Sequence, residues 1–170
     1  MPLAASVLIP IAEYLETSYR PDREYIDGEI LERNMGSWEH SRIQFLLALW
    51  FGQNERSWGV QGATEWRTQV APSRIRIPDL VLVRQGAQTR VLSTAPVLII
   101  EILSPEDTYV ETERRAADYQ KMGVETIWII DPETRTGRVC TGNSWTQAAR
   151  LDVPGTPIYV ELDTLFAGLD

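Results

Sequence analysis

Two acidic residues stand where strand-like patterns favour apolar side chains. Glu101 lies within "VLIIEILSP" (97–105), and Asp79 lies within "RIRIPDLVLV" (74–83). Because side chains alternate faces along a strand, each acid shares its predicted face with apolar neighbours. An ionised carboxylate in such surroundings is costly unless a cation, a metal ion or a proton compensates it. The two segments therefore point to a site built on carboxylate chemistry.

If the two strands are neighbours, Asp79 and Glu101 can converge. Two carboxylates that lie close together have pKa values that shift apart, or they require a divalent cation. The alternative for each acid is a buried salt bridge with an arginine such as Arg74, Arg76 or Arg115, because structural ion pairs occupy similar positions. For the pair taken together, with a helix after the second strand, we favour the metal site.

The elements that must position these acids form a mixed α/β domain with one sheet and flanking helices. We predict helices over 11–19, 37–56 and 104–123, a hairpin over 23–33 around Asp27-Gly28, and strands near 64–70, 75–83, 96–103 and 124–132. A short antiparallel meander is predicted after residue 132. Pro78 removes a ladder hydrogen bond, so the second strand is expected to bend or to lie at an edge there.

Local signals fix the expected helix ends. Ser37 is a suitable N-cap for the helix over 37–56. For the helix over 104–123, Ser104 is the predicted N-cap, Asp107 completes a capping box, and Gly123 supplies the C-terminal stop.

Length and composition suit a single domain over 1–170. The 170 residues are 44% hydrophobic and 24% charged, and no apolar stretch approaches the roughly 20 residues of a membrane helix. The single cysteine, Cys140, excludes an internal disulfide and fits a cytoplasmic protein. The net charge of −8 argues against a protein that is basic overall, whereas nucleic-acid binders usually present a basic face.

Five motifs, in order, carry a family resemblance: "EYIDGEI", the "EH" pair at 39–40, "RIPDLVLV", "LIIEILSP" and "DYQKMGVETIWIIDP". Together they resemble the Uma2 family (DUF820) of restriction-endonuclease-like proteins, within the PD-(D/E)xK nuclease superfamily. The resemblance covers a core of about 23–132. It implies a restriction-endonuclease-like mixed central β-sheet flanked by helices, with an extra N-terminal hairpin and a C-terminal β-meander.

The resemblance also implies an endonuclease that hydrolyses phosphodiester bonds in DNA with Mg²⁺ or Mn²⁺. Asp79 and Glu101 would be catalytic carboxylates and metal ligands, with the backbone carbonyl of Ile102 as a further oxygen ligand. His40, the only histidine, would complete the metal site and is preferred over Glu39. Its alternative is a solvated histidine near the start of a helix.

The chain departs from the superfamily pattern at its lysine. The position two residues after Glu101 is Leu103, and the helical lysine of the family corresponds to Arg115, four residues before Tyr119. An arginine can stabilise a phosphate but cannot readily act as a base, so Arg115 is predicted to be an electrostatic clamp. The alternative is a surface pair with Glu111.

Three further residues are candidate nucleic-acid contacts. Arg74 and Arg76 flank the proline-aspartate motif and could contact phosphates, and Trp38 could stack on a base. A second function stays open, in which the chain is a catalytically impaired relative that binds nucleic acid or protein. Nucleases of this fold often act on both strands of a duplex, so we also expect a homodimer.

Overall fold

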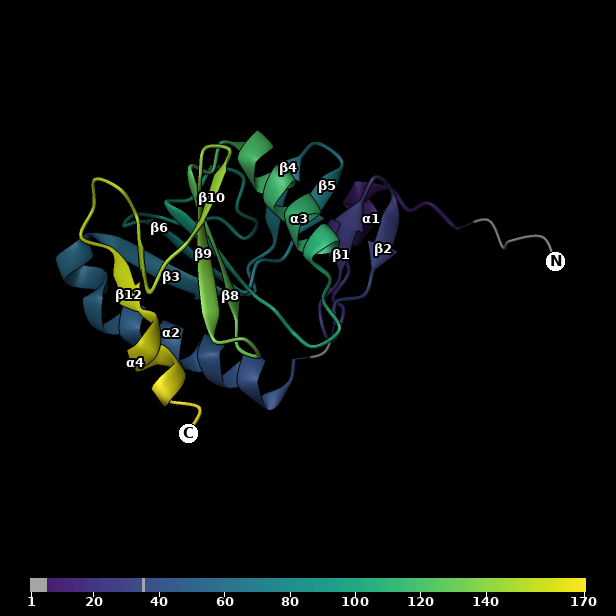
Figure 1. The fold of residues 1–170 in the computed structure, drawn as a ribbon. Coiled ribbons are helices and arrows are strands. Elements are labelled where there is room, and N and C mark those ends of the chain that lie inside the picture. Colours follow the sequence, from purple (N-terminus) through teal and green to yellow (C-terminus); the bar gives the residue numbers. More distant parts are fainter. Residues whose placement is uncertain (1–5, 35) are drawn as a thin grey trace.

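A mixed six-stranded sheet forms the centre of the computed structural model, which describes residues 6–34 and 36–170 (Figure 1). Its strands are β3 (Val60–Thr64), β6 (Leu80–Arg84), β7 (Leu98–Ile102), β8 (Thr126–Asp131), β9 (Thr136–Thr141) and β10 (Ser144–Gln147). Their spatial order is β10-β9-β8-β7-β6-β3, and only the β7–β8 pair is parallel. This arrangement confirms the predicted fold class of a mixed sheet with flanking helices.

Helices cover both faces of the central sheet (Figure 1). They are α2 (Trp38–Trp58), α3 (Tyr109–Met122) and α4 (Leu162–Ala167). Leu82 and Ile100 pack with α2 and α4 in one hydrophobic cluster, whereas Val81 and Ile99 pack with α3 in another. Alternation along β7 therefore places Glu101, two residues after Ile99, on the face that α3 covers.

A second, four-stranded sheet lies beside the first, with strand order β2-β1-β5-β4. Its strands are β1 (Glu24–Ile26), β2 (Glu29–Leu31), β4 (Thr68–Ala71) and β5 (Arg74–Arg76), and α1 (Ile11–Glu16) packs on it through Tyr14. Asp27 and Gly28 both have positive φ, 51° and 96°, as a tight two-residue hairpin turn requires. The predicted hairpin is confirmed.

The predicted strand over 75–83 is wrong as a single element. The chain leaves β5 in the four-stranded sheet and enters β6 in the central sheet, with Pro78 between them. Proline cannot donate to a ladder, so the break falls where the sequence contains that residue. Asp79 consequently lies at the junction of the two sheets. The predicted strand near 64–70 is likewise divided, between β3 and β4.

Of the two helix starts predicted from N-cap residues, one is confirmed and one is wrong. Ser37 caps α2 by accepting a hydrogen bond from the backbone N–H of His40, as predicted. The helix predicted from residue 104 begins instead at Tyr109, because Thr108 caps it through the N–H of Glu111. Ser104 bonds the Asp107 carboxylate in a preceding turn. The first helix ends at Glu16, short of the predicted residue 19.

The C-terminal segment joins the core of the central sheet. The predicted meander is divided between two sheets. Its first two strands are β9 and β10 of the central sheet, whereas its last strand, β12 (Tyr159–Glu161), pairs with β11 (Arg150–Asp152) in a separate two-stranded sheet. Leu151, Leu165 and Phe166 belong to the same hydrophobic cluster as α2 and the central strands. We propose that the whole chain folds as one domain, of which residues 1–5 and 35 lie outside the described part.

This shared core makes a specific prediction for unfolding. Phe166→Ala should destabilise the entire protein by about 3–5 kcal/mol, because Phe166 is 3% exposed in that cluster. Phe45→Ala, on a side chain that is 58% exposed, is the matched control and should change stability by about 0.5 kcal/mol or less. Urea unfolding followed by tryptophan fluorescence and by far-UV circular dichroism should give one coincident transition. Two separate transitions would contradict the single domain.

Candidate active site

Asp79 and Glu101 lie together at one end of the central sheet. The antiparallel register of β6 and β7 pairs Leu80 with Ile100, and continuing it by one residue brings Asp79 opposite Glu101. The N–H of Ile102 donates a 2.7 Å hydrogen bond to Oδ2 of Asp79, which fixes that carboxylate against β7. Both side chains are buried, since Asp79 is 4% and Glu101 3% exposed. The strand patterns predicted this convergence.

Two basic side chains reach the other oxygen of Asp79. Nη2 of Arg33 lies 3.3 Å from Oδ1, and Nε2 of His40 lies 3.2 Å from the same atom. His40 is in the first turn of α2, where the Ser37 cap holds the backbone. Arg33 comes from the segment between β2 and α2, and no pattern in the sequence singled it out.

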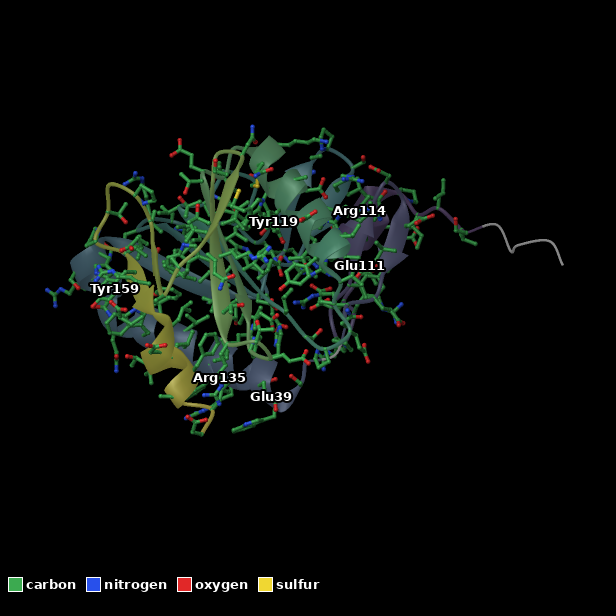
Figure 2. All side chains as sticks on the ribbon, in the orientation of Figure 1. Glu39, Glu111, Arg114, Tyr119, Arg135 and Tyr159 are labelled. Carbon is green, nitrogen blue, oxygen red and sulfur yellow. The ribbon has the colours of Figure 1, made fainter. Side chains whose placement is uncertain are left out.

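Glu101 is held from α3. The hydroxyl of Tyr119 donates a 2.5 Å hydrogen bond to Oε1, and Nη1 of Arg115 lies 3.6 Å from Oε2. The four-residue spacing of these two side chains puts both on the same face of the helix. Figure 2 shows Tyr119 on the side of α3 that faces the central sheet, with Arg114 on the other side. Among the ion pairs of the described residues, Arg115 pairs with Glu24 and Glu101 and not with Glu111.

The two carboxylates have opposite pKa shifts. Burial, together with the charge of Asp79, raises the pKa of Glu101 to about 8, although Arg115 and Tyr119 act to lower it. Burial also acts to raise the pKa of Asp79, but the contacts with His40, the Ile102 N–H and Arg33 outweigh it and lower that pKa. Burial acts to lower the pKa of His40, and the Asp79 contact outweighs it and raises that pKa. The pair therefore carries one firmly ionised carboxylate and one that readily takes up a proton.

A network of buried charges extends from Glu101 into the four-stranded sheet. Glu24 lies 3.7 Å from Arg115 and 3.0 Å from Arg76, and it also accepts from the N–H of Ile77. Arg76 in turn bonds Asp118 of α3 at 2.8 Å. We did not single out Glu24 or Asp118 from the sequence.

The structure places some predicted site residues in one pocket. A pocket of about 190 Å³ opens onto this cluster, and its lining includes Asp79, Ile102, His40, Arg115 and Arg33. The predicted catalytic and metal-binding residues thus meet in or directly behind one cavity, since Glu101 lies behind its wall.

The candidate nucleic-acid contacts lie apart from that pocket. Arg76 is buried between Glu24 and Asp118, and Arg74 is paired with Asp118 and Asp27. Trp38 is 66% exposed and lines a neighbouring hollow of about 440 Å³ with Glu39 and Arg135. Figure 2 shows those last two side chains beside the start of α2 and the end of α4. A role for these residues in binding nucleic acid stays a prediction.

The donor atoms suit a hard divalent cation in their chemistry. Two carboxylates and a backbone carbonyl are oxygen donors, and the mutual repulsion that raises the Glu101 pKa would be relieved by a positive ion. Across 6–34 and 36–170, no group of three or more His, Cys, Asp or Glu side chains is arranged to hold a metal. An ion at Asp79 and Glu101 would therefore depend on the Ile102 carbonyl, water and substrate for its other ligands, as is usual for Mg²⁺.

Comparisons with known proteins identify the family and support the fold. A family model, Uma2, described as "Putative restriction endonuclease", matches residues 11–167. The crystal structure of a protein from Anabaena variabilis ATCC 29413, described as "a putative nuclease belonging to DUF820", is similar with a TM-score of 0.84 and 23% identity. That match covers 95% of this chain and 99% of the other, and it supports the fold.

Two other comparisons add little. A cryo-electron microscopy structure of a DrdV–DNA complex has a TM-score of 0.42 and 16% identity, over 74% of this chain and 10% of that one. A similarity of that size supports no inference. No match was found among curated proteins.

The raised pKa of Glu101 predicts how stability depends on pH. The folded protein binds a proton at Glu101 more tightly than the unfolded chain does, so stability from this group is full below about pH 4.5 and is lost as the pH rises towards 8. Glu101→Gln should remove this loss. A difference of one in pKa corresponds to about 1.4 kcal/mol of stability. A change of 1 kcal/mol in stability corresponds to about 2–4 °C in Tm. The Tm of Glu101→Gln relative to that of wild type should therefore rise by several degrees as the pH increases from 5 to 8.5.

Thermal unfolding in EDTA, at a series of pH values, measures this difference. Glu113→Gln is the control, because Glu113 is exposed on the same helix. A difference between Glu101→Gln and wild type that stays constant with pH would show that Glu101 is ionised throughout.

Proposed function

Because the chain belongs to the Uma2 family of restriction-endonuclease-like proteins, we propose that it is a nuclease that uses Mg²⁺ or Mn²⁺ to hydrolyse phosphodiester bonds in DNA. The observation that carries this proposal is the meeting of two buried carboxylates, Asp79 in the wall of a pocket and Glu101 behind it, where Arg33, His40 and Arg115 also line the pocket. Carboxylates suit the metal ion and basic side chains suit a phosphate, so the site has candidate groups for binding both.

Asp79, Glu101 and the carbonyl of Ile102 would hold the metal ion. When bound, the ion would neutralise charge on the scissile phosphate and lower the pKa of the attacking water. The protein holds each of the two carboxylates with a hydrogen bond. The Ile102 N–H orients Asp79, and the Tyr119 hydroxyl orients Glu101. Such preorganisation lowers the cost of assembling the site around its substrate.

Arg115 has the role of a fixed positive charge. Glu101 and Glu24 outweigh the effect of burial and raise its pKa above the ordinary arginine value, so it does not deprotonate to act as a base. Its guanidinium borders the pocket and can stabilise negative charge on a bound phosphate. Nε2 of His40 lies 3.2 Å from Oδ1 of Asp79, and the raised pKa of His40 favours a proton there that would support the charge of that carboxylate.

Cleavage assays test the proposal directly. Asp79→Asn and Glu101→Gln should each lower Mn²⁺-dependent cleavage of a mixed panel of duplex and single-stranded DNA by at least about 100-fold, because each removes a charge that the transition state needs. Asp152→Asn, at a side chain about half exposed on β11, is the control and should cleave as wild type. Equal activity in all four proteins would refute a role for the two carboxylates.

A second function, binding without catalysis, is favoured by two observations. The position of the family lysine holds Arg115, whose guanidinium is paired with two carboxylates, and the net charge is −8. Arg115→Lys separates the two functions. A catalytic clamp predicts that the lysine variant cleaves at least as well as wild type whereas Arg115→Ala loses activity. A chain that binds DNA but is inactive in wild type and in both variants would be the binding-only relative.

Several finer features stay proposals. DNA as the substrate, Mg²⁺ or Mn²⁺ as the ion, a homodimer and a cytoplasmic location all rest on the family and on the sequence. None of the helices in the described part of the chain is long and apolar enough to cross a membrane. Light scattering on the purified protein will show whether two copies associate.

A further inference from the structure

Arg33 occupies the side of Asp79 that a metal ion would need. Oδ2 of Asp79 accepts from the Ile102 N–H, and Oδ1 lies next to both Arg33 and His40, at 3.3 and 3.2 Å. A carboxylate oxygen has two lone pairs, so these contacts use the acceptor capacity of Oδ1. A cation that bound Asp79 at Oδ1 would therefore have to displace one of the two side chains.

Of those two side chains, Arg33 has both an unsatisfied donor and a second acidic partner. Its Nη1 already bonds Glu65 at 3.1 Å, and its Nε is buried with no hydrogen-bond partner among the described residues. A buried donor left unsatisfied is unfavourable, so moving the arginine towards solvent relieves that cost. Glu65 is 54% exposed at the rim of the same pocket, which gives the guanidinium a second partner nearer to solvent.

Charge repulsion disfavours the binding of Arg33 and a metal ion to Asp79 at the same time. Arg33 is only 12% exposed, so its interaction with a nearby ion is weakly screened. A divalent ion carries twice the charge of a protonated side chain, so its repulsion with a guanidinium on the same buried carboxylate is strong. The ion binds more favourably once Arg33 has moved away.

We propose that Arg33 competes with the divalent cation for Asp79, and that the site takes up the metal when the guanidinium shifts from Asp79 to Glu65 and the incoming phosphate. This inference rests on the proposed metal-dependent function. It gives Arg33 a positioning role: the residue keeps Asp79 paired in the absence of metal and becomes a phosphate contact in its presence. Metal and substrate would then bind cooperatively, since the phosphate offers the displaced arginine a partner.

Calorimetric titration with Mn²⁺ alone tests the competition. Arg33→Gln removes the charge and should bind Mn²⁺ at least tenfold more tightly than wild type. Arg33→Lys retains a charge and should stay within about threefold of wild type. Arg23→Gln removes the same charge from a half-exposed arginine outside the pocket, paired with Glu32, and should leave the affinity unchanged. Arg33→Met provides a second uncharged variant if the glutamine variant does not fold.

The outcomes separate this inference from the proposed function. If wild type binds Mn²⁺ and neither Arg33→Gln nor Arg33→Met binds it more tightly, the competition is overturned and the metal site stands. No binding in wild type or in either uncharged variant would overturn both. Tighter binding in Arg33→Gln that disappears when Asp79→Asn is added would support the inference and assign the competition to Asp79.

Discussion

The placement of Asp79 and Glu101 across two neighbouring strands is the constraint on which the rest of the structure depends. Two buried carboxylates repel each other, and the apolar sheet around them supplies no compensation. Compensation comes instead from each surrounding layer. The segment after the hairpin contributes Arg33, α2 contributes His40, and α3 contributes Arg115 and a neutral hydrogen bond from a tyrosine. The layers are therefore tied together by charge as well as by hydrophobic contact.

This arrangement explains how an acidic chain can place arginines beside a pocket. The net charge is −8, yet Arg33, Arg76 and Arg115 are drawn inward by Glu24, Asp118 and the two central acids, so positive and negative groups lie together at the pocket. A substrate held in this way would be recognised by local contacts with a phosphate and less by a long-range basic surface. The same pairing stabilises the junction of the two sheets, because removing one partner of a buried ion pair leaves an uncompensated charge.

Local chemistry made part of this structure predictable from sequence. The alternation of "VLIIEILSP" places Glu101 on the face that α3 covers, Ser37 caps α2, and the Asp27-Gly28 turn closes the hairpin, because each depends on a few neighbouring residues. The start of α3 was missed because Ser104 and Thr108 are both good caps, and the Ser104–Asp107 turn decides between them.

The long-range part of the site was not predictable from one sequence. Arg33 lies in an irregular segment, and its partner Asp79 is 46 residues away. The partners of Arg76 are likewise 52 and 42 residues distant, and the burial of its side chain between Glu24 and Asp118 depends on how the sheets pack. Such pairs depend on how the sheets pack, which residue type and spacing do not specify.

The most direct test of the metal site is a crystal structure of the wild-type protein soaked with Mn²⁺, with anomalous scattering used to locate the ion. The account predicts an anomalous peak at coordinating distance from the carboxylates of both Asp79 and Glu101. The account would be contradicted by a structure in which Arg33 and Arg115 stay paired with these acids and manganese lies only at other carboxylates or nowhere.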